Sequence, residues 1–145
     1  MQVAVKKLNQ EALLPTYGSE GAACFDIYAL EGGRVHAGMS RVFRTGLAFE
    51  IPPGWVLKIF SRSGHGFKNG VRLVNSVGII DADYRGELMV GLASDSQIGE
   101  AGFEVKAGDR IAQGMLEPVA RVSFLEQNYL SETARGAGGL GSTGA

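Results

Sequence analysis

The sequence predicts an all-β domain, either a sandwich or a barrel, and two observations support this. Apolar and polar residues alternate in many short runs that are rich in β-branched and aromatic residues, as in half-buried strands. Glycine accounts for 22 of the 145 residues, roughly twice its usual share, which indicates frequent chain reversals. Since no segment carries a sustained helical repeat, the strands have to pack on one another.

The expected strands follow one another at short intervals. They occupy residues 3–8, 24–30, 41–51, 55–60, 87–92, 102–108 and 110–126. Turn-forming residues separate them, namely Glu31-Gly32-Gly33, Pro52-Pro53-Gly54, Asn69-Gly70 and Ala107-Gly108-Asp109. Any helix has to be short, and the best place for one is after the stretch Ser61-Arg62-Ser63-Gly64.

The chain is predicted to be one domain, residues 1–130, followed by a glycine-rich tail, residues 131–145. Gly136, Gly138 and Gly141 in the tail satisfy the dinucleotide-binding pattern G-x-G-x-x-G. Only Ser142 to Ala145 follow them, so no helix N-terminus can meet a pyrophosphate, and this function is excluded. A disordered terminus is the simplest alternative.

The overall composition excludes several classes of function. A formal net charge of −1 and a pI near 6.1 give no basic surface for nucleic acid. The apolar runs are too short to cross a membrane, and the N-terminus lacks the apolar run of a signal peptide. Cys24 is the single cysteine and cannot form an internal disulfide. We therefore expect a cytoplasmic protein with a small ligand.

Three stretches carry functional groups that a β core does not need. Residues 61–70, SRSGHGFKNG, offer hydroxyls, a guanidinium and a helix start, and they form either a phosphate site or a polar loop with a serine cap. Residues 75–88, NSVGIIDADYRGEL, indicate a β-hairpin whose tip carries Asp, Tyr and Arg, either for a ligand or as a solvated turn. Residues 108–113, GDRIAQ, place Arg110 and Gln113 on a strand, where a surface salt bridge is the simpler alternative.

Other chemistry is absent from the sequence. His36 and His65 have no metal-ligand spacing with each other or with Cys24, and the chain has neither a nucleophile elbow nor a P-loop. Asp26, within the apolar run CFDIY, either faces water or is half-buried and paired. The remaining groups suit metal-assisted phosphate chemistry in which the ligand supplies the oxygens that bind the metal.

Taken in order, these stretches resemble the five motifs of the homotrimeric deoxyuridine triphosphatase (dUTPase) family. The matching segments are GAACFDIYA, SRSGHGFKNG, NSVGIIDADYRGEL, GDRIAQ and RGAGGLGSTG. The resemblance spans nearly the whole chain and implies a homotrimer of jelly-roll-like β-barrels with shared active sites. It also implies Mg²⁺-dependent hydrolysis of dUTP to dUMP and pyrophosphate, which limits uracil in DNA and supplies dUMP for dTTP synthesis.

The resemblance assigns roles to matching residues. Asp81 would hold the attacking water, and Asp26 would belong to a network around Arg62 and a metal-bound water. Tyr84 would stack on the deoxyribose and exclude a 2′-hydroxyl. Asn75 and the backbone between Gly78 and Tyr84, which includes Ile80, would read the uracil. The other expected substrate-binding residues are Ser63, Gly64 and Gln113 with Arg62 at the phosphates, Arg135, Leu140, Gly141, Ser142 and Thr143 in a closing arm, and Met89, which has no more specific role. No side chain would bind Mg²⁺ directly; the phosphates and water would hold it.

Two positions depart from the family pattern. Leu140 stands where the family usually has Phe, so the arm is expected to cover the base less tightly, and His65 occupies a position that is commonly small or aliphatic. A related dCTP deaminase and a nucleotide-gated interaction protein are the alternatives. The Asp-x-x-Tyr segment and the complete terminal motif argue against the deaminase, whereas a protein partner in addition to catalysis stays open.

Overall fold

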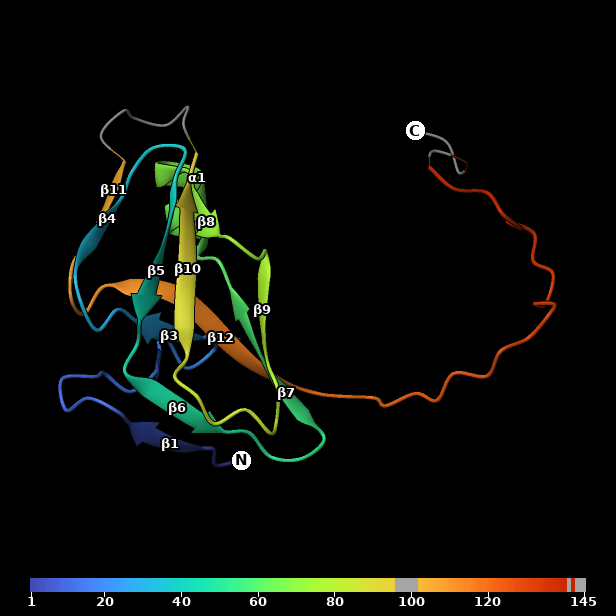
Figure 1. Cartoon of the computed structure of the whole chain (residues 1–145), viewed down its shortest axis with the longest axis horizontal. Helices are drawn as coiled ribbons and strands as arrows, with labels where there is room; N and C mark the ends of the chain where they lie inside the picture. The colour runs from blue at the N-terminus through green and yellow to red at the C-terminus, as the bar shows by residue number, and fades with distance from the viewer. Residues whose placement is uncertain (96–101, 141, 143–145) are drawn as a thin grey trace.

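The computed structural model describes residues 1–95, 102–140 and 142, in which the regular elements are strands and one short helix (Figure 1). In chain order they are β1 (Ala4–Lys7), β2 (Thr16–Tyr17), β3 (Phe25–Tyr28), β4 (Gly33–Val35), β5 (Ser40–Arg44), β6 (Leu47–Glu50), β7 (Trp55–Phe60), α1 (Ser63–Asn69), β8 (Val71–Leu73), β9 (Val77–Ile80), β10 (Met89–Ser94), β11 (Phe103–Val105) and β12 (Arg110–Pro118). The predicted all-β class is confirmed.

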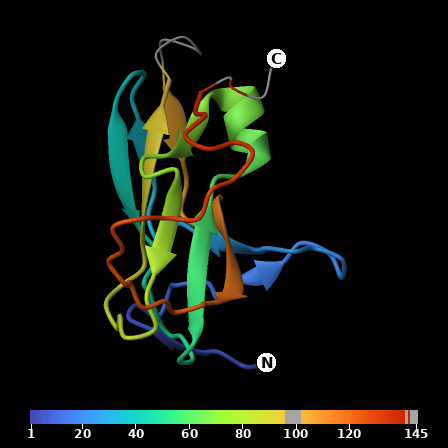
Figure 2. The same ribbon diagram turned by 90° about the vertical axis from the view of Figure 1, so that its right-hand side faces the viewer.

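The described strands pair in four antiparallel sheets. The largest has the order β2-β3-β12-β7-β9, and the others are β5-β10-β8, β11-β4 and β1-β6. Figure 2, turned by 90°, places α1 and the N-terminus at opposite ends of these sheets, as Figure 1 does. The arrangement agrees with a jelly-roll-like fold, although the described ladders remain separate sheets and do not close into one barrel.

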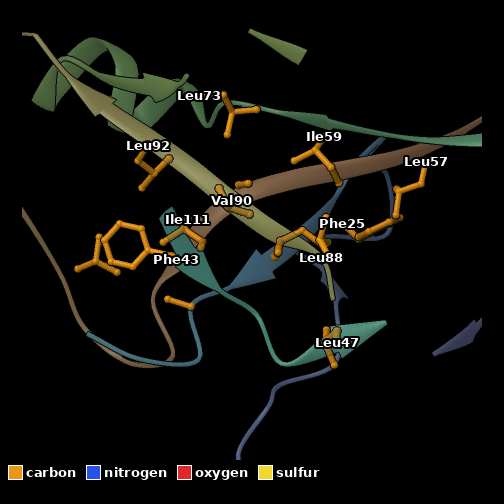
Figure 3. Packing of buried hydrophobic residues seen from close by; sticks show 14 of the residues in the cluster. Phe25, Phe43, Leu47, Leu57, Ile59, Leu73, Leu88, Val90, Leu92 and Ile111 are labelled. Carbon is orange, nitrogen blue, oxygen red and sulfur yellow. The ribbon is translucent and has the colours of Figure 1, made fainter. Parts of the chain in front are cut away.

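A single hydrophobic core joins the five-stranded and three-stranded sheets. Leu57 and Ile111 point into it from one sheet, and Phe43 and Leu92 from the other, and all four are at most 1% exposed (Figure 3). Burying each such side chain stabilises the fold by about 1.5–3 kcal/mol relative to exposure. Side chains of β10 alternate between buried and more exposed, which is the period-2 pattern that predicted the strand.

The run 41–51, predicted as one strand, is divided into β5 and β6 by a corner at Thr45 and Gly46. Gly46 has a φ of +69°, which favours glycine. The buried Thr45 hydroxyl donates to the carbonyl of Leu88 (2.6 Å) and accepts from the N–H of Leu47 (3.2 Å). The corner lets β5 pair with β10 and β6 pair with β1.

The hairpin predicted for residues 75–88 is wrong. β9 pairs with β7, whereas β10 pairs with β5 and β8. Residues 81–88 therefore cross from one sheet to another, and β9 and β10 lie apart. The hydrophobic pattern located both strands but could not show that each prefers a distant partner.

The short helix begins at Ser63, within the predicted stretch. Gly70 ends it in the left-handed conformation, with a φ of 59°, and its N–H bonds to the carbonyl of Gly66. The N-cap is Arg62, which makes no side-chain capping bond, so the serine cap considered as an alternative is wrong. The Ser61 hydroxyl accepts instead from the N–H of Leu73 at 2.9 Å.

The predicted last strand, 110–126, ends early at Pro118. Residues 119–130 are exposed and carry no strand, and Figure 1 shows the chain running away from the sheets beyond β12. The domain boundary at residue 130 stays a prediction. Among the described residues, no helix has the length and apolarity needed to cross a bilayer.

Candidate active site

Asp26 lies at the centre of a charged cluster that joins β3, β12 and the start of α1. One carboxylate oxygen accepts from Nε of Arg62 (3.2 Å) and the other from Nη1 of Arg110 (3.3 Å). Asp26 is only 9% exposed, and an unpaired carboxylate at that depth would be strongly destabilising. Two cations against one anion leave the cluster with a net positive charge, which favours an anionic ligand.

Gln113, Ser63 and Gly64 border this cluster. Gln113 lies directly opposite Asp26 in the ladder between β12 and β3, and its Nε2 donates to the carbonyl of Ser61 at 3.0 Å. Ser63 and Gly64 are exposed, and a Cβ on Gly64 would have no neighbour within 4 Å. The surface above this turn is therefore open enough for a ligand to approach the backbone.

His65 connects the cluster to β12 and β11. Its Nε2 lies 2.7 Å from the carbonyl oxygen of Arg110 and 3.3 Å from Nη1 of Arg62. The short contact with a carbonyl requires Nε2 to carry the hydrogen and donate it. The ring also packs edge-on against Phe103, with centroids 4.9 Å apart. In this chain, the histidine therefore holds the Arg110 carbonyl in place beside the arginine cluster.

A second candidate region is the groove between β9 and β10. A cavity of about 320 Å³ has walls formed by apolar residues of both strands and also contains Asn75, Gly78, Ile80 and Met89. Gly78 is buried there, and a Cβ would lie 3.0 Å from Cβ of Ile59. The structure therefore gathers four of the expected substrate-binding residues in one cavity, although β9 and β10 do not pair.

The groove continues into a smaller hollow of about 220 Å³ that contains Asp81 and Tyr84 and shares Ile80 and Met89 with the first cavity. Asp81 directly follows β9, and its carbonyl accepts from the N–H of Tyr84 at 3.1 Å, which turns the chain. Both side chains are exposed. A planar ring placed in the apolar cavity would have a carboxylate and a tyrosine ring next to it.

The described tail residues, 131–140 and 142, meet neither region within this chain. The Nε of Arg135 donates to the carbonyl of Gly138 at 2.9 Å, the N–H of Ser142 donates to the carbonyl of Gly139, and Leu140 is fully exposed. Gly141 and Thr143 lie outside the described residues. In Figure 1 the tail stands well away from the sheets.

The two regions lie far apart in one chain. The ladder pairs Asp26 with Gln113, Gln113 with Phe60 and Phe60 with Val77, which is three strand spacings of about 4.8 Å each. Asp81 lies four positions beyond Val77, just past the end of β9, at about 3.3 Å per residue. An offset of about 14 Å across the strands and about 13 Å along them, taken at right angles, separates the backbones of Asp26 and Asp81 by about 20 Å.

Arg110 was considered from the sequence only as a residue that could reach a ligand or form a surface salt bridge. Its bond to Asp26 spans 84 positions, which local sequence patterns cannot reveal. Burial raises the pKa of the Cys24 thiol, so the thiolate is scarce at neutral pH and the residue is a poor nucleophile. Within residues 1–95, 102–140 and 142, no three His, Cys, Asp or Glu side chains gather as a protein-held metal would require.

Comparisons with known proteins agree across the whole chain. A family model described as dUTPase matches residues 10–144. The deoxyuridine 5'-triphosphate nucleotidohydrolase of Nautilia profundicola is 47% identical over 144 residues, covering 99% of both chains, and that of Wolinella succinogenes is 41% identical, covering 99% of this chain and 95% of the relative. The Staphylococcus bacteriophage 80alpha dUTPase, solved with dUPNHPP, superposes with a TM-score of 0.89 at 25% identity over 99% of both chains. The chain belongs to the dUTPase family.

Proposed function

We propose that this protein hydrolyses dUTP to dUMP and pyrophosphate by attack of a water molecule on the α-phosphorus. The observation that carries the proposal is the groove between β9 and β10, where an apolar cavity leads directly to Asp81 and Tyr84. Near full-length similarity to named deoxyuridine 5'-triphosphate nucleotidohydrolases supports it.

The groove suits a uracil base. β9 is the edge strand of its sheet, and β10 pairs with β8 only at Leu92–Ser94. The carbonyl of Gly91 in β10 already accepts from the N–H of Val74 at 2.9 Å, whereas the outer edge of β9 offers backbone N–H and C=O groups to a ligand. These groups can match the alternating acceptors and donor on the edge of uracil. The close walls would exclude a 5-methyl group, and Asn75 adds a further amide.

Asp81 is the proposed acceptor for the attacking water. The exposed carboxylate of Asp81 can accept a hydrogen bond from the water, orient it and partly remove its proton. The ring of Tyr84 would lie against the deoxyribose, where a 2′-hydroxyl would collide with it.

The phosphates would be bound by Arg62, Ser63, Gly64 and Gln113. Since this group lies about 20 Å from Asp81 in one chain, a single nucleotide cannot meet both groups of the same subunit. We infer a homotrimer in which one copy supplies the groove, a second the arginine cluster and a third the tail. The exposed apolar side chains Val122, Phe124, Leu125, Tyr129 and Leu130 support this, because they suit contact with another copy.

The residues at the cluster suit a triphosphate that carries its own Mg²⁺. Asp26, the carboxylate in the cluster, is already bonded to two guanidinium groups, so it would contact the ion through water. When bound, Mg²⁺ would neutralise phosphate charge. Arg62 and backbone N–H groups would hold the phosphates, and Arg135, Ser142 and Thr143 would close over the last one while Leu140 covers the base.

The experiment is a pyrophosphate-release assay with dUTP, dTTP, dCTP and UTP in the presence of Mg²⁺. We expect the wild type to turn over dUTP and none of the other three nucleotides. In Asp81→Asn, turnover should be lost while nucleotide binding persists. Equal rates on all four substrates would overturn the proposed base and sugar recognition. Release of ammonia from dCTP would point instead to a deaminase, and normal turnover by Asp81→Asn would remove the role of Asp81.

A further inference from the structure

The ring of Tyr84 lies against the backbone of Gly86. A Cβ added to Gly86 would lie 2.5 Å from Cζ of Tyr84 and even closer to its hydroxyl oxygen. Real Cβ atoms do not come that near to another heavy atom, so the ring can hold this position only because residue 86 has no side chain. Gly86 does not have a positive φ, so steric clearance is the reason for glycine here.

The same end of the ring, which carries the hydroxyl, is held by a hydrogen bond. The Tyr84 hydroxyl donates to the carbonyl of Glu87 at 3.0 Å. The Glu87 carboxylate in turn accepts from the N–H of Gly46 (2.8 Å) and from Nε of Arg44 (3.1 Å). The acceptor of the tyrosine is thus fixed to the corner between β5 and β6.

The neighbouring residue strengthens this attachment. The carbonyl of Leu88 accepts from the buried hydroxyl of Thr45, and its N–H donates to the carbonyl of Leu47 at 2.8 Å. Five hydrogen bonds therefore join residues 87 and 88 to residues 44–47, since Nε of Arg44 reaches both carboxylate oxygens of Glu87. The support under the ring belongs to the rigid sheet framework, although Tyr84 itself is on an exposed crossover.

We propose that Gly86 and the anchored carbonyl of Glu87 are specificity-determining elements, which hold the Tyr84 ring where it excludes a ribonucleotide. The inference rests on the proposed function and deepens it, because it identifies what fixes the wall of the sugar site. Ribose differs from deoxyribose by one oxygen atom, so a ring displaced by about the width of a methyl group no longer meets that oxygen. Steric discrimination of this size amounts to about 10- to 200-fold in kcat/KM.

The test is the substitution Gly86→Ala, with kcat/KM measured for dUTP and UTP. The added methyl displaces the phenol, which is the free end of a side chain, so the protein should fold and its preference for dUTP over UTP should drop by about 10-fold or more. Gly21→Ala is the matched control, since Gly21 is exposed with nothing within 4 Å of an added Cβ, and it should retain the wild-type ratio. Tyr84→Phe keeps the clearance but loses the bond to Glu87, and its ratio should drop by about 2- to 10-fold.

The outcomes separate this inference from the proposed function. A wild-type protein that does not prefer dUTP to UTP overturns both. If the wild type prefers dUTP and the Gly86→Ala variant keeps that preference, the inference about Gly86 is overturned while the proposed function stands. Loss of the far-UV circular dichroism spectrum in Gly86→Ala also contradicts it, since the backbone rather than the ring would then have yielded, and an unchanged Tyr84→Phe ratio removes the role of the Glu87 carbonyl.

Discussion

Mixing two inactive variants tests whether each active site is shared between copies of the chain. Asp81→Asn removes the proposed acceptor for water, and Arg62→Ala removes a cation from the proposed phosphate-binding cluster. In Arg62→Ala, Asp26 keeps its ion pair with Arg110, so the cluster is weakened without leaving a buried charge unpaired. Each variant alone is expected to be nearly inactive.

The magnitude follows from the geometry. Asp26 with its arginine partners lies about 20 Å from Asp81 in one chain, so the proposed site combines Asp81 of one copy with Arg62 of another. In every trimer that carries both variants, one of the three sites combines an intact Asp81 with an intact Arg62 of the next copy. Recovery of about one third of wild-type activity is expected in such trimers, against none if both groups came from the same chain.

The assay is dUTP-dependent pyrophosphate release by trimers that carry both variants, isolated with two different affinity tags. Mixing Asp81→Asn with wild type is the control, and it should retain about half of the wild-type rate. If the doubly tagged trimers stay at the background of the single variants, the reasoning from strand spacing is refuted.

Three further substitutions test the cluster, the corner and the tail. Asp26→Asn should lower the free energy of unfolding in urea by about 2–3 kcal/mol, below the usual cost of breaking a buried pair because Arg110 is half exposed. Glu104→Gln, in the exposed pair with Arg34, should cost at most about 0.5 kcal/mol, and equal costs would contradict the assigned anchoring by Asp26. Thr45→Val should cost about 2–4 kcal/mol because it leaves the Leu88 carbonyl and Leu47 N–H unsatisfied; a thermal midpoint within about 1 °C of wild type would argue against this corner. Leu140→Phe should lower the KM for dUTP about 5-fold by stacking on the base, and unchanged kinetic constants would show that residue 140 does not cover it.

Local patterns predicted most strands because alternation depends only on neighbouring residues. The run 55–60 became β7 with the predicted bounds, and a short helix begins at Ser63. The same patterns failed where pairing is non-local. They merged β5 and β6 because the φ of Gly46 and the bonds of Thr45 depend on residues far along the chain, and they paired β9 with β10 because the two are adjacent in sequence.

Composition, periodicity and spacing were enough to predict the fold class, the order of the motifs and the types of functional group, because these are local properties of the chain. Which groups meet became visible only in the folded chain. Asp26 contacts Arg110 because β3 and β12 pair across 84 positions, and Tyr84 lies on Gly86 because residues 87 and 88 are tied to the corner at Thr45. The separation of Asp81 from the arginine cluster also follows from strand order, because a contact between distant segments depends on how the sheets assemble.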